Sequence, residues 1–205
     1  MTAGRTAPDR HSHKEGCVSV QPQANPSAVL FLDTETTGLS HADEIIEFAA
    51  VLASYDRETG RLGAEIDHYH GLREPRCPIG HHATKIHGLT MSDVYRKQLD
   101  YRKIESLMTR ADFIVAHNAG FDKRFVTQLF PSATNLDWRC SARQIKWTDL
   151  GFPNGRLQQL LAAHGIQAHR AHRALDDVRA LMTMLRHRKY FSALCDHRPA
   201  NIKYK

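Results

Sequence analysis

The sequence predicts one α/β domain whose helices flank a mixed β-sheet. In the first half of the chain, apolar runs are joined by short turn-like segments, a pattern typical of an antiparallel meander. In the second half, a short apolar run is followed by helical segments, as in the strand–helix units of parallel sheets. A chain of 205 residues is long enough for one substantial core and short for two full domains.

The predicted meander contains three strands. The apolar run 28–33 has the length and composition of a buried strand. Residues 45–55 are rich in β-branched and aromatic side chains and form the second strand. The turn-like segment 56–60 separates this strand from a third, at about 65–72.

Helices are expected to dominate from residue 81 onward. The stretch 81–110 is mostly helical in pattern, with an interruption at Gly88. A short apolar strand at 112–116 then leads into a helix at about 121–130. This helix stops before Pro131, because proline disfavours a helical conformation in the residue before it.

Three further helical segments are predicted after Cys140, with breaks at 151–155 and at Gly165. The last segment, at about 172–190, has apolar residues at helical spacing. These residues are Leu175, Val178, Leu181, Met182 and Leu185.

The two ends of the chain lack such patterns. Residues 1–26 are polar and contain three prolines, so we expect a flexible leader before a folded domain at 27–190 and a tail at 191–205. No apolar run approaches the ~20 residues of a membrane-spanning helix. The four cysteines lie too far apart for a zinc ribbon and suggest no secreted disulfide framework. These features predict a cytoplasmic protein with reduced thiols.

The net charge of +6 favours a polyanionic partner such as nucleic acid. Charge alone does not decide this, because a basic surface without a binding role explains it equally well. The positions of the acidic residues are more informative.

Asp33 and Glu35 stand at the end of the first predicted strand. Residues two apart in an extended chain project from the same face, so their carboxylates can converge. A polar strand end that turns into a loop is the alternative explanation. Asp122 falls in the first turn of the helix after 112–116, where it could also serve only to stabilise the helix dipole.

A third acidic segment contains Asp176 and Asp177. At ~100° per residue, Asp176 lies roughly opposite the apolar stripe of its helix, whereas Asp177 lies nearer the flank of the stripe. We therefore expect Asp177 to face a cleft and Asp176 to be solvated. His172 lies at or just before the helix start, where it could stand beside that cleft, although a lone histidine is usually structural or exposed.

Such a set of residues suits phosphodiester hydrolysis. Two divalent ions ~3.5–4 Å apart can activate water and stabilise both the attacking and the leaving oxygens. Carboxylates without a cysteine or a tight histidine cluster select Mg²⁺ or Mn²⁺ over zinc. A histidine titrates near neutral pH and is suited to take the proton of the nucleophilic water.

At these positions the sequence resembles the DEDDh family of 3′–5′ exonucleases, which includes the proofreading epsilon subunit of bacterial DNA polymerase III and RNase T. The resemblance runs from about residue 28 to 190 and rests on three motifs in the expected order. They are Asp33-Thr-Glu35-Thr-Thr-Gly38, His117-Asn-Ala-Gly-Phe-Asp122, and His172 with Asp177 five positions later.

The resemblance implies a ribonuclease H-like fold and a role for each motif position. Asp33, Glu35 and Asp177 would hold one ion, and Asp33 would hold a second together with Asp122, which would bind it directly or through water. His172 would be the general base. The substrate-contacting residues that it implies are Thr36, Thr37, Leu39, His117, Asn118 and Phe121.

The favoured hypothesis is a stand-alone exonuclease on 3′ ends of single-stranded DNA or RNA. Basic residues near the last helix are expected to contact the phosphate backbone, although a solvated helix face explains the last three nearly as well: Arg170, Arg173, Arg186, Arg188 and Lys189. The alternatives are a proofreading or repair subunit that acts with a polymerase, and a non-catalytic nucleic-acid-binding module. The chain lacks the longer tail by which the epsilon subunit attaches to its polymerase, which disfavours a dedicated replicative proofreader. A homodimer is left open because some relatives are dimers.

Overall fold

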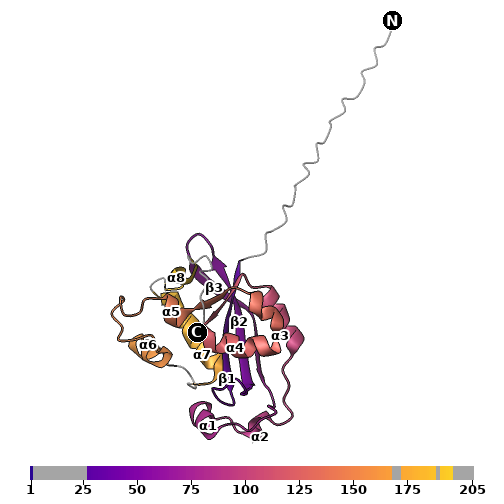
Figure 1. Cartoon of the computed structure of the whole chain (residues 1–205). Coiled ribbons are helices and arrows are strands. Elements are labelled where there is room, and N and C mark those ends of the chain that lie inside the picture. The colour runs from indigo at the N-terminus through magenta and orange to yellow at the C-terminus, as the bar shows by residue number, and fades with distance from the viewer. Residues whose placement is uncertain (2–26, 168–171, 188–189, 196–205) are drawn as a thin grey trace.

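The computed structural model describes Met1 and residues 27–167, 172–187 and 190–195. A five-stranded sheet with the order β3-β2-β1-β4-β5 forms its centre (Figure 1). The antiparallel strands are β1 (Ala28–Thr36), β2 (Ile45–Asp56) and β3 (Arg61–Leu72). Parallel to β1 lies β4 (Phe113–Ala116), and β5 (Trp138–Cys140) lies parallel to β4. The mixed α/β fold predicted from the sequence is confirmed.

Helices pack on both faces of this sheet. In chain order they are α1 (His81–His87), α2 (Met91–Val94), α3 (Tyr101–Thr109), α4 (Ala119–Leu129), the 3₁₀ helix η1 (Pro131–Asn135), α5 (Ser141–Gln144), α6 (Leu157–Ala163), α7 (Ala174–Arg186) and α8 (Ser192–Cys195). Figure 1 shows α1 and α2 together beyond one end of the sheet, below the start of α7.

Two apolar cores lie on opposite faces of the sheet, and β1 contributes side chains to both. Val29 and Phe31 contribute to the core under α7, whereas Leu30 and Leu32 contribute to the core under α3 and α4. This alternation is the two-residue period of a strand, here apolar on both faces because each face is covered. The core under α7 continues through Phe191, beyond the expected domain end at residue 190.

Some element boundaries differ from those that the sequence predicts. The first strand extends to Thr36, because its polar end continues to pair with β2. Strand β5 was missed, since three residues are too few to show a period. Gly88 ends α1 in a left-handed conformation with φ 75°, which glycine adopts without steric cost. Among the described residues, no helix has the length and apolar character needed to cross a membrane.

Candidate functional site

Three of the predicted acids meet at the carboxyl end of β1. Asp33 and Glu35 lie two residues apart on this strand, and Asp177 comes from the first turn of α7. One carboxylate oxygen from each residue lies within 4.8 Å of those from the other two. An oxygen-only donor set of this kind suits hard cations such as Mg²⁺ or Mn²⁺. The chemistry of the three residues therefore fits a divalent metal ion.

Burial and mutual repulsion disfavour ionisation of these carboxylates. The pKa of Asp33 is raised well above its ordinary value, first by burial and then by the charges of Asp122 and Glu35. The pKa of Glu35 is raised to about 8 by burial and by the charges of Glu47 and Asp177. Burial also raises the pKa of Asp177. A bound cation relieves such repulsion, so the electrostatics of the cluster favour metal binding.

Asp122 reaches the same region from α4. The parallel strands β1 and β4 end at one edge of the sheet, and α4 begins directly after β4. The carboxylate of Asp122 is buried, and its Oδ1 accepts hydrogen bonds from the backbone N–H and the hydroxyl of Thr34, at 3.1 and 2.9 Å. Burial raises its pKa to about 7 in spite of these bonds. Asp122 thus lies outside the group of three acids but beside it, and its charge acts on Asp33.

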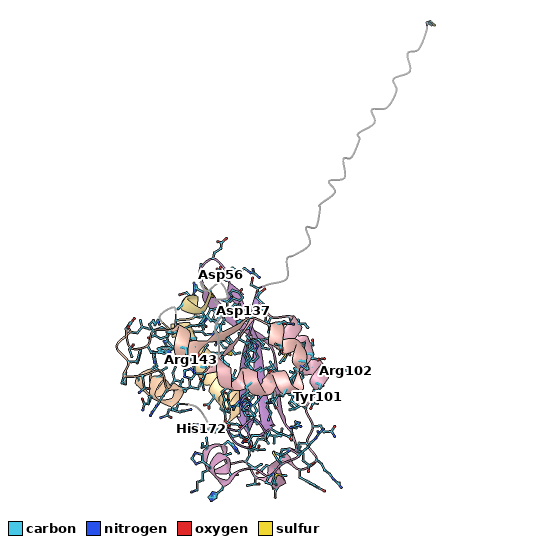
Figure 2. The ribbon with its side chains drawn as sticks, viewed as in Figure 1. Asp56, Tyr101, Arg102, Asp137, Arg143 and His172 are labelled. Atoms are coloured by element: carbon cyan, nitrogen blue, oxygen red, sulfur yellow. The ribbon has the colours of Figure 1, made fainter. Side chains whose placement is uncertain are left out.

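His172 stands in the chain just before α7, as the helical pattern predicted. Its side chain is exposed, its backbone has a left-handed φ of 61°, and its backbone N–H donates to Oδ2 of Asp177 at 3.2 Å. In Figure 2 the labelled His172 lies below the sheet, near the start of α7. An open cleft of about 670 Å³ is lined by Asp33, His172 and Asp177 together with residues of α6.

His117 lines this cleft and bonds to Gly155, another residue of its wall. Its Nε2 lies 2.7 Å from the carbonyl of Gly155, and its Nδ1 lies 3.0 Å from the hydroxyl of Ser141. Burial lowers the pKa of His117, so the ring is neutral at neutral pH. Because the carbonyl can only accept, Nε2 carries the proton and Nδ1 accepts from the serine. The exposed Asn118 lines the same cleft and has a left-handed φ of 68°.

The segment expected to meet the terminal nucleotide is the turn after β1. The hydroxyl of Thr36 donates to the carbonyl of Gly38 at 2.6 Å, and both backbone polar groups of Thr37 are bonded within the protein. The side chain of Leu39 is 69% exposed. Phe121 is half-buried in the first turn of α4, with its ring 5.0 Å from that of Phe125. Leu39 and Phe121 therefore offer apolar surface that a base or a sugar could cover.

The family model RNase_T, which describes an exonuclease domain, matches residues 30–185. This chain belongs to the RNase T exonuclease family. The match includes Asp33, Glu35, Asp122, His172 and Asp177. The family resemblance stated from the sequence motifs is therefore confirmed.

Relatives of this exonuclease-family chain include proteins named as DNA polymerase III or as a subunit of it. It is 33% identical over 158 residues to the PolC-type DNA polymerase III of Thermotoga petrophila. The aligned region covers 72% of this chain and 11% of that protein. It is 32% identical over 169 residues to the DNA polymerase III epsilon subunit of Treponema pallidum. Here the aligned region covers 76% of this chain and 75% of that protein. The chain thus spans only a small part of the PolC-type protein and most of the epsilon subunit.

Solved exonuclease structures share the fold. Escherichia coli exonuclease I in complex with a dA16 oligonucleotide superposes with a TM-score of 0.62 and 22% sequence identity. The superposition covers 80% of this chain and 42% of that one. At this identity the likeness concerns the fold, which in both proteins is that of RNase H-like exonucleases.

Glu47 is a charged residue beside the site of this exonuclease-family chain that was not predicted from the sequence. Glu47 lies on β2 directly opposite Glu35 and is fully buried. Its carboxylate binds the guanidinium of Arg173, with Nη2 2.8 Å from Oε1. A lone acid in a strand whose neighbours are all apolar is the signal that could have drawn attention to it.

Arg173 was expected to contact nucleic acid, but its guanidinium instead binds Glu47 within the protein. Arg186 donates to the backbone carbonyl of Gly63 at 2.7 Å. The other predicted backbone contacts, Arg170, Arg188 and Lys189, lie outside the described residues. A further missed contact is that of Gln158 in α6, whose Nε2 lies 3.0 Å from Oδ1 of Asp177.

Proposed function

We propose that this chain is a 3′–5′ exonuclease of the DEDDh type that releases nucleoside monophosphates from the 3′ ends of single-stranded DNA or RNA. The observation that carries the proposal is the convergence of Asp33, Glu35 and Asp177 within 4.8 Å, beside a cleft that Asp33 and Asp177 line together with His172. Family membership makes a nuclease the natural use of such a cluster.

The residues divide into two roles in the proposed reaction. Asp33, Glu35 and Asp177 would hold one Mg²⁺ or Mn²⁺ ion, and Asp33 with Asp122 would hold a second. The ions would lower the pKa of the nucleophilic water and stabilise the negative charge on the leaving oxygen. His172 would accept the proton of that water, because its exposed imidazole belongs to the same cleft.

The surrounding protein supports these groups. The hydrogen bonds from Thr34 hold one oxygen of Asp122, and the side-chain amide of Gln158 holds one oxygen of Asp177. The other oxygen of Asp177 accepts the backbone N–H of His172 and has a second lone pair that could bind an ion. The exposed Leu39 would cover the terminal base or sugar, which places the 3′ end against the acids.

A direct assay tests this proposal. A 5′-labelled single-stranded oligonucleotide, offered as matched DNA and RNA, is incubated with the protein and Mg²⁺, with Asp33→Ala as the control. We expect a ladder that shortens from the 3′ end, abolished by EDTA and by the substitution. Equal degradation by the wild-type protein and Asp33→Ala would indicate a contaminating nuclease and would leave the chain as a non-catalytic binding module.

A second candidate function is a proofreading or repair subunit that works with a polymerase. The specific observation in its favour is the 32% identity to the epsilon subunit, with 75% of that protein covered. The discriminating measurement is co-purification of a tagged chain with a DNA polymerase, together with excision of a mismatched 3′ nucleotide from a primer–template. A chain that purifies alone and does not prefer mismatched ends would favour the stand-alone enzyme.

A further inference from the structure

Glu47 has no place in the proposed metal site, although it lies next to it. Both of its carboxylate oxygens are engaged within the protein: Oε1 by Arg173 and by Nε2 of His70 at 2.7 Å, and Oε2 by Arg173 and by the backbone N–H of Ala174 at 3.3 Å. Burial alone would raise the pKa of Glu47, but these contacts outweigh it and lower the pKa to about 2, so the carboxylate is ionised at neutral pH. It is fully buried. A carboxylate bound in this way serves its protein neighbours rather than a metal ion.

The neighbours of Glu47 form the start of α7. The N-cap residue of this helix, Arg173, makes no local side-chain capping bond. Glu47 instead accepts the first amide of the helix, that of Ala174, from the adjacent strand β2, and clamps the Arg173 side chain through both Nε and Nη2. A helix start normally needs such an acceptor, because its first amides have no partner within the helix. Glu47, a residue of β2, therefore caps the N-terminus of α7.

The clamped turn also carries two residues of the proposed site. The backbone N–H of His172 donates to Oδ2 of Asp177, and the backbone N–H of Asp177 donates to the carbonyl of Arg173 at 3.0 Å. His172 also holds a left-handed φ of 61°, which a residue with a side chain keeps only where its surroundings enforce it. Arg173, which Glu47 fixes, is the residue between the left-handed His172 and the helix.

We propose that Glu47 is a positioning residue, which holds the start of α7 through Arg173 and the Ala174 amide so that His172 and Asp177 keep their productive arrangement. This inference rests on the proposed function, since it assigns a task within the same reaction. The contact between Glu47 and the start of α7 does not depend on activity. Glu47 is expected to hold the start of α7 in the protein without substrate.

The first test measures hydrogen exchange in the full chain. Glu47→Gln keeps the size of the side chain but removes its charge and one of its acceptor oxygens. We expect faster amide exchange in peptides that cover residues 172–178 and unchanged exchange in peptides that cover α4. Unchanged exchange at the start of α7 would overturn the inference, whatever the activity of the protein.

The second test separates positioning from mere stability. Kinetics with a 5′-labelled DNA oligonucleotide and Mg²⁺ are measured at a temperature where circular dichroism shows each variant folded. We expect Glu47→Gln to lower kcat about 10- to 100-fold with KM nearly unchanged, because displacement of about 1 Å at catalytic groups has effects of this size. Arg173→Lys keeps the charge but loses the two-point contact, and is expected to lower kcat less. A folded Glu47→Gln variant with the kcat of the wild type would overturn the inference.

A matched control and a double variant complete the design. Asp137 forms a half-buried pair with Arg139, 2.7 Å apart, and Figure 2 shows it toward the opposite end of the sheet from His172. Asp137→Asn is therefore expected to leave kcat unchanged. In a His172→Ala background, Glu47→Gln should lower kcat by a smaller factor than in the wild type, because the part of its effect that acts through His172 is already lost and only the part through Asp177 remains. An equal loss in both backgrounds would contradict a role through His172.

Different results would reject the proposed function and the positioning role of Glu47. If the wild-type protein has no Mg²⁺-dependent activity, or Asp33→Ala retains it, the proposed function fails while the exchange experiment still tests the cap. If the wild type is active and Asp33→Ala is not, a Glu47→Gln variant that is unaffected in kcat rejects the positioning role alone.

Discussion

Thr34 donates two hydrogen bonds to a single oxygen of Asp122, one from its backbone N–H and one from its hydroxyl. Thr34 lies between Asp33 and Glu35 on β1, and its side chain is buried. Strand side chains alternate between the two faces of the sheet, so Thr34 points away from its two acidic neighbours. It thereby fixes the acid from α4 against the strand that carries the other two.

Removal of the Thr34 hydroxyl should loosen Asp122. Thr34→Val keeps the shape of the side chain, and we expect a loss of about 1–2 kcal/mol in the free energy of unfolding, since one bond to a buried carboxylate is lost. Activity should fall roughly tenfold because Asp122 is less well oriented. Chemical denaturation and oligonucleotide kinetics measure the two effects. Thr34→Ser, which keeps the hydroxyl, should restore most of both, and equal losses in the two variants would argue against this bond.

Metal binding should stabilise the protein more at high pH than at low pH. The pKa of Glu35 is raised from 4.5 to about 8 in the folded, metal-free protein. The unfolded chain therefore releases this proton first, and the stability of the metal-free protein falls as pH rises from about 4.5 to about 8. An ion removes this penalty, so Mg²⁺ should raise the melting temperature clearly at pH 8 and little near about pH 5.5. Glu35→Gln should reduce the difference, and a Mg²⁺ effect independent of pH would contradict this explanation.

His172 should matter for the rate of hydrolysis and little for metal binding. We expect His172→Ala to lower kcat by about 10²–10⁴-fold, the usual contribution of a positioned general base. Its side chain is exposed, so the free energy of unfolding should be nearly unchanged. The stabilisation by Mg²⁺ should also persist, because the carboxylates remain. Loss of that stabilisation in the variant would instead indicate that the imidazole is a metal ligand.

A substitution at Leu39 should affect substrate binding without affecting the stability of the protein. It is 69% exposed, and Nη2 of Arg124 donates to its backbone carbonyl at 2.9 Å. Leu39→Ala should leave the melting temperature unchanged, since little buried surface is lost. It should raise the KM for a single-stranded oligonucleotide several-fold if the side chain covers the terminal base or sugar. An unchanged KM would remove Leu39 from the substrate-binding surface.

The strand that carries the site could be predicted because the positions of its acids follow from the periodicity of neighbouring residues. The two-residue period of a strand is sufficient to place Asp33 and Glu35 on one side, and the helical period identifies Asp177 as the buried acid of its pair. Asp176, which was expected to be solvated, is half-buried. The first turn of α4 likewise follows from the apolar strand before it. These inferences need no knowledge of tertiary contacts.

The parts that the sequence did not predict depend on long-range contacts. Glu47 and Arg173 are 126 positions apart, and nothing in either local pattern indicates that they pair. Arg173 was instead expected to face a phosphate, because a basic residue beside a predicted nucleic-acid site has no other visible partner in the sequence. The engagement of both ring nitrogens of His117 is equally invisible, since its partner Gly155 is 38 positions away.

The most direct measurement of the central claim is anomalous diffraction from crystals soaked in Mn²⁺. The account predicts a strong peak at about 2.1–2.2 Å from carboxylate oxygens of Asp33, Glu35 and Asp177, the distance expected for a small divalent ion. It predicts a second peak between Asp33 and Asp122 when a nucleoside monophosphate is present. Wild-type crystals that bind Mn²⁺ only elsewhere on the protein, with no peak among these acids, would contradict the account.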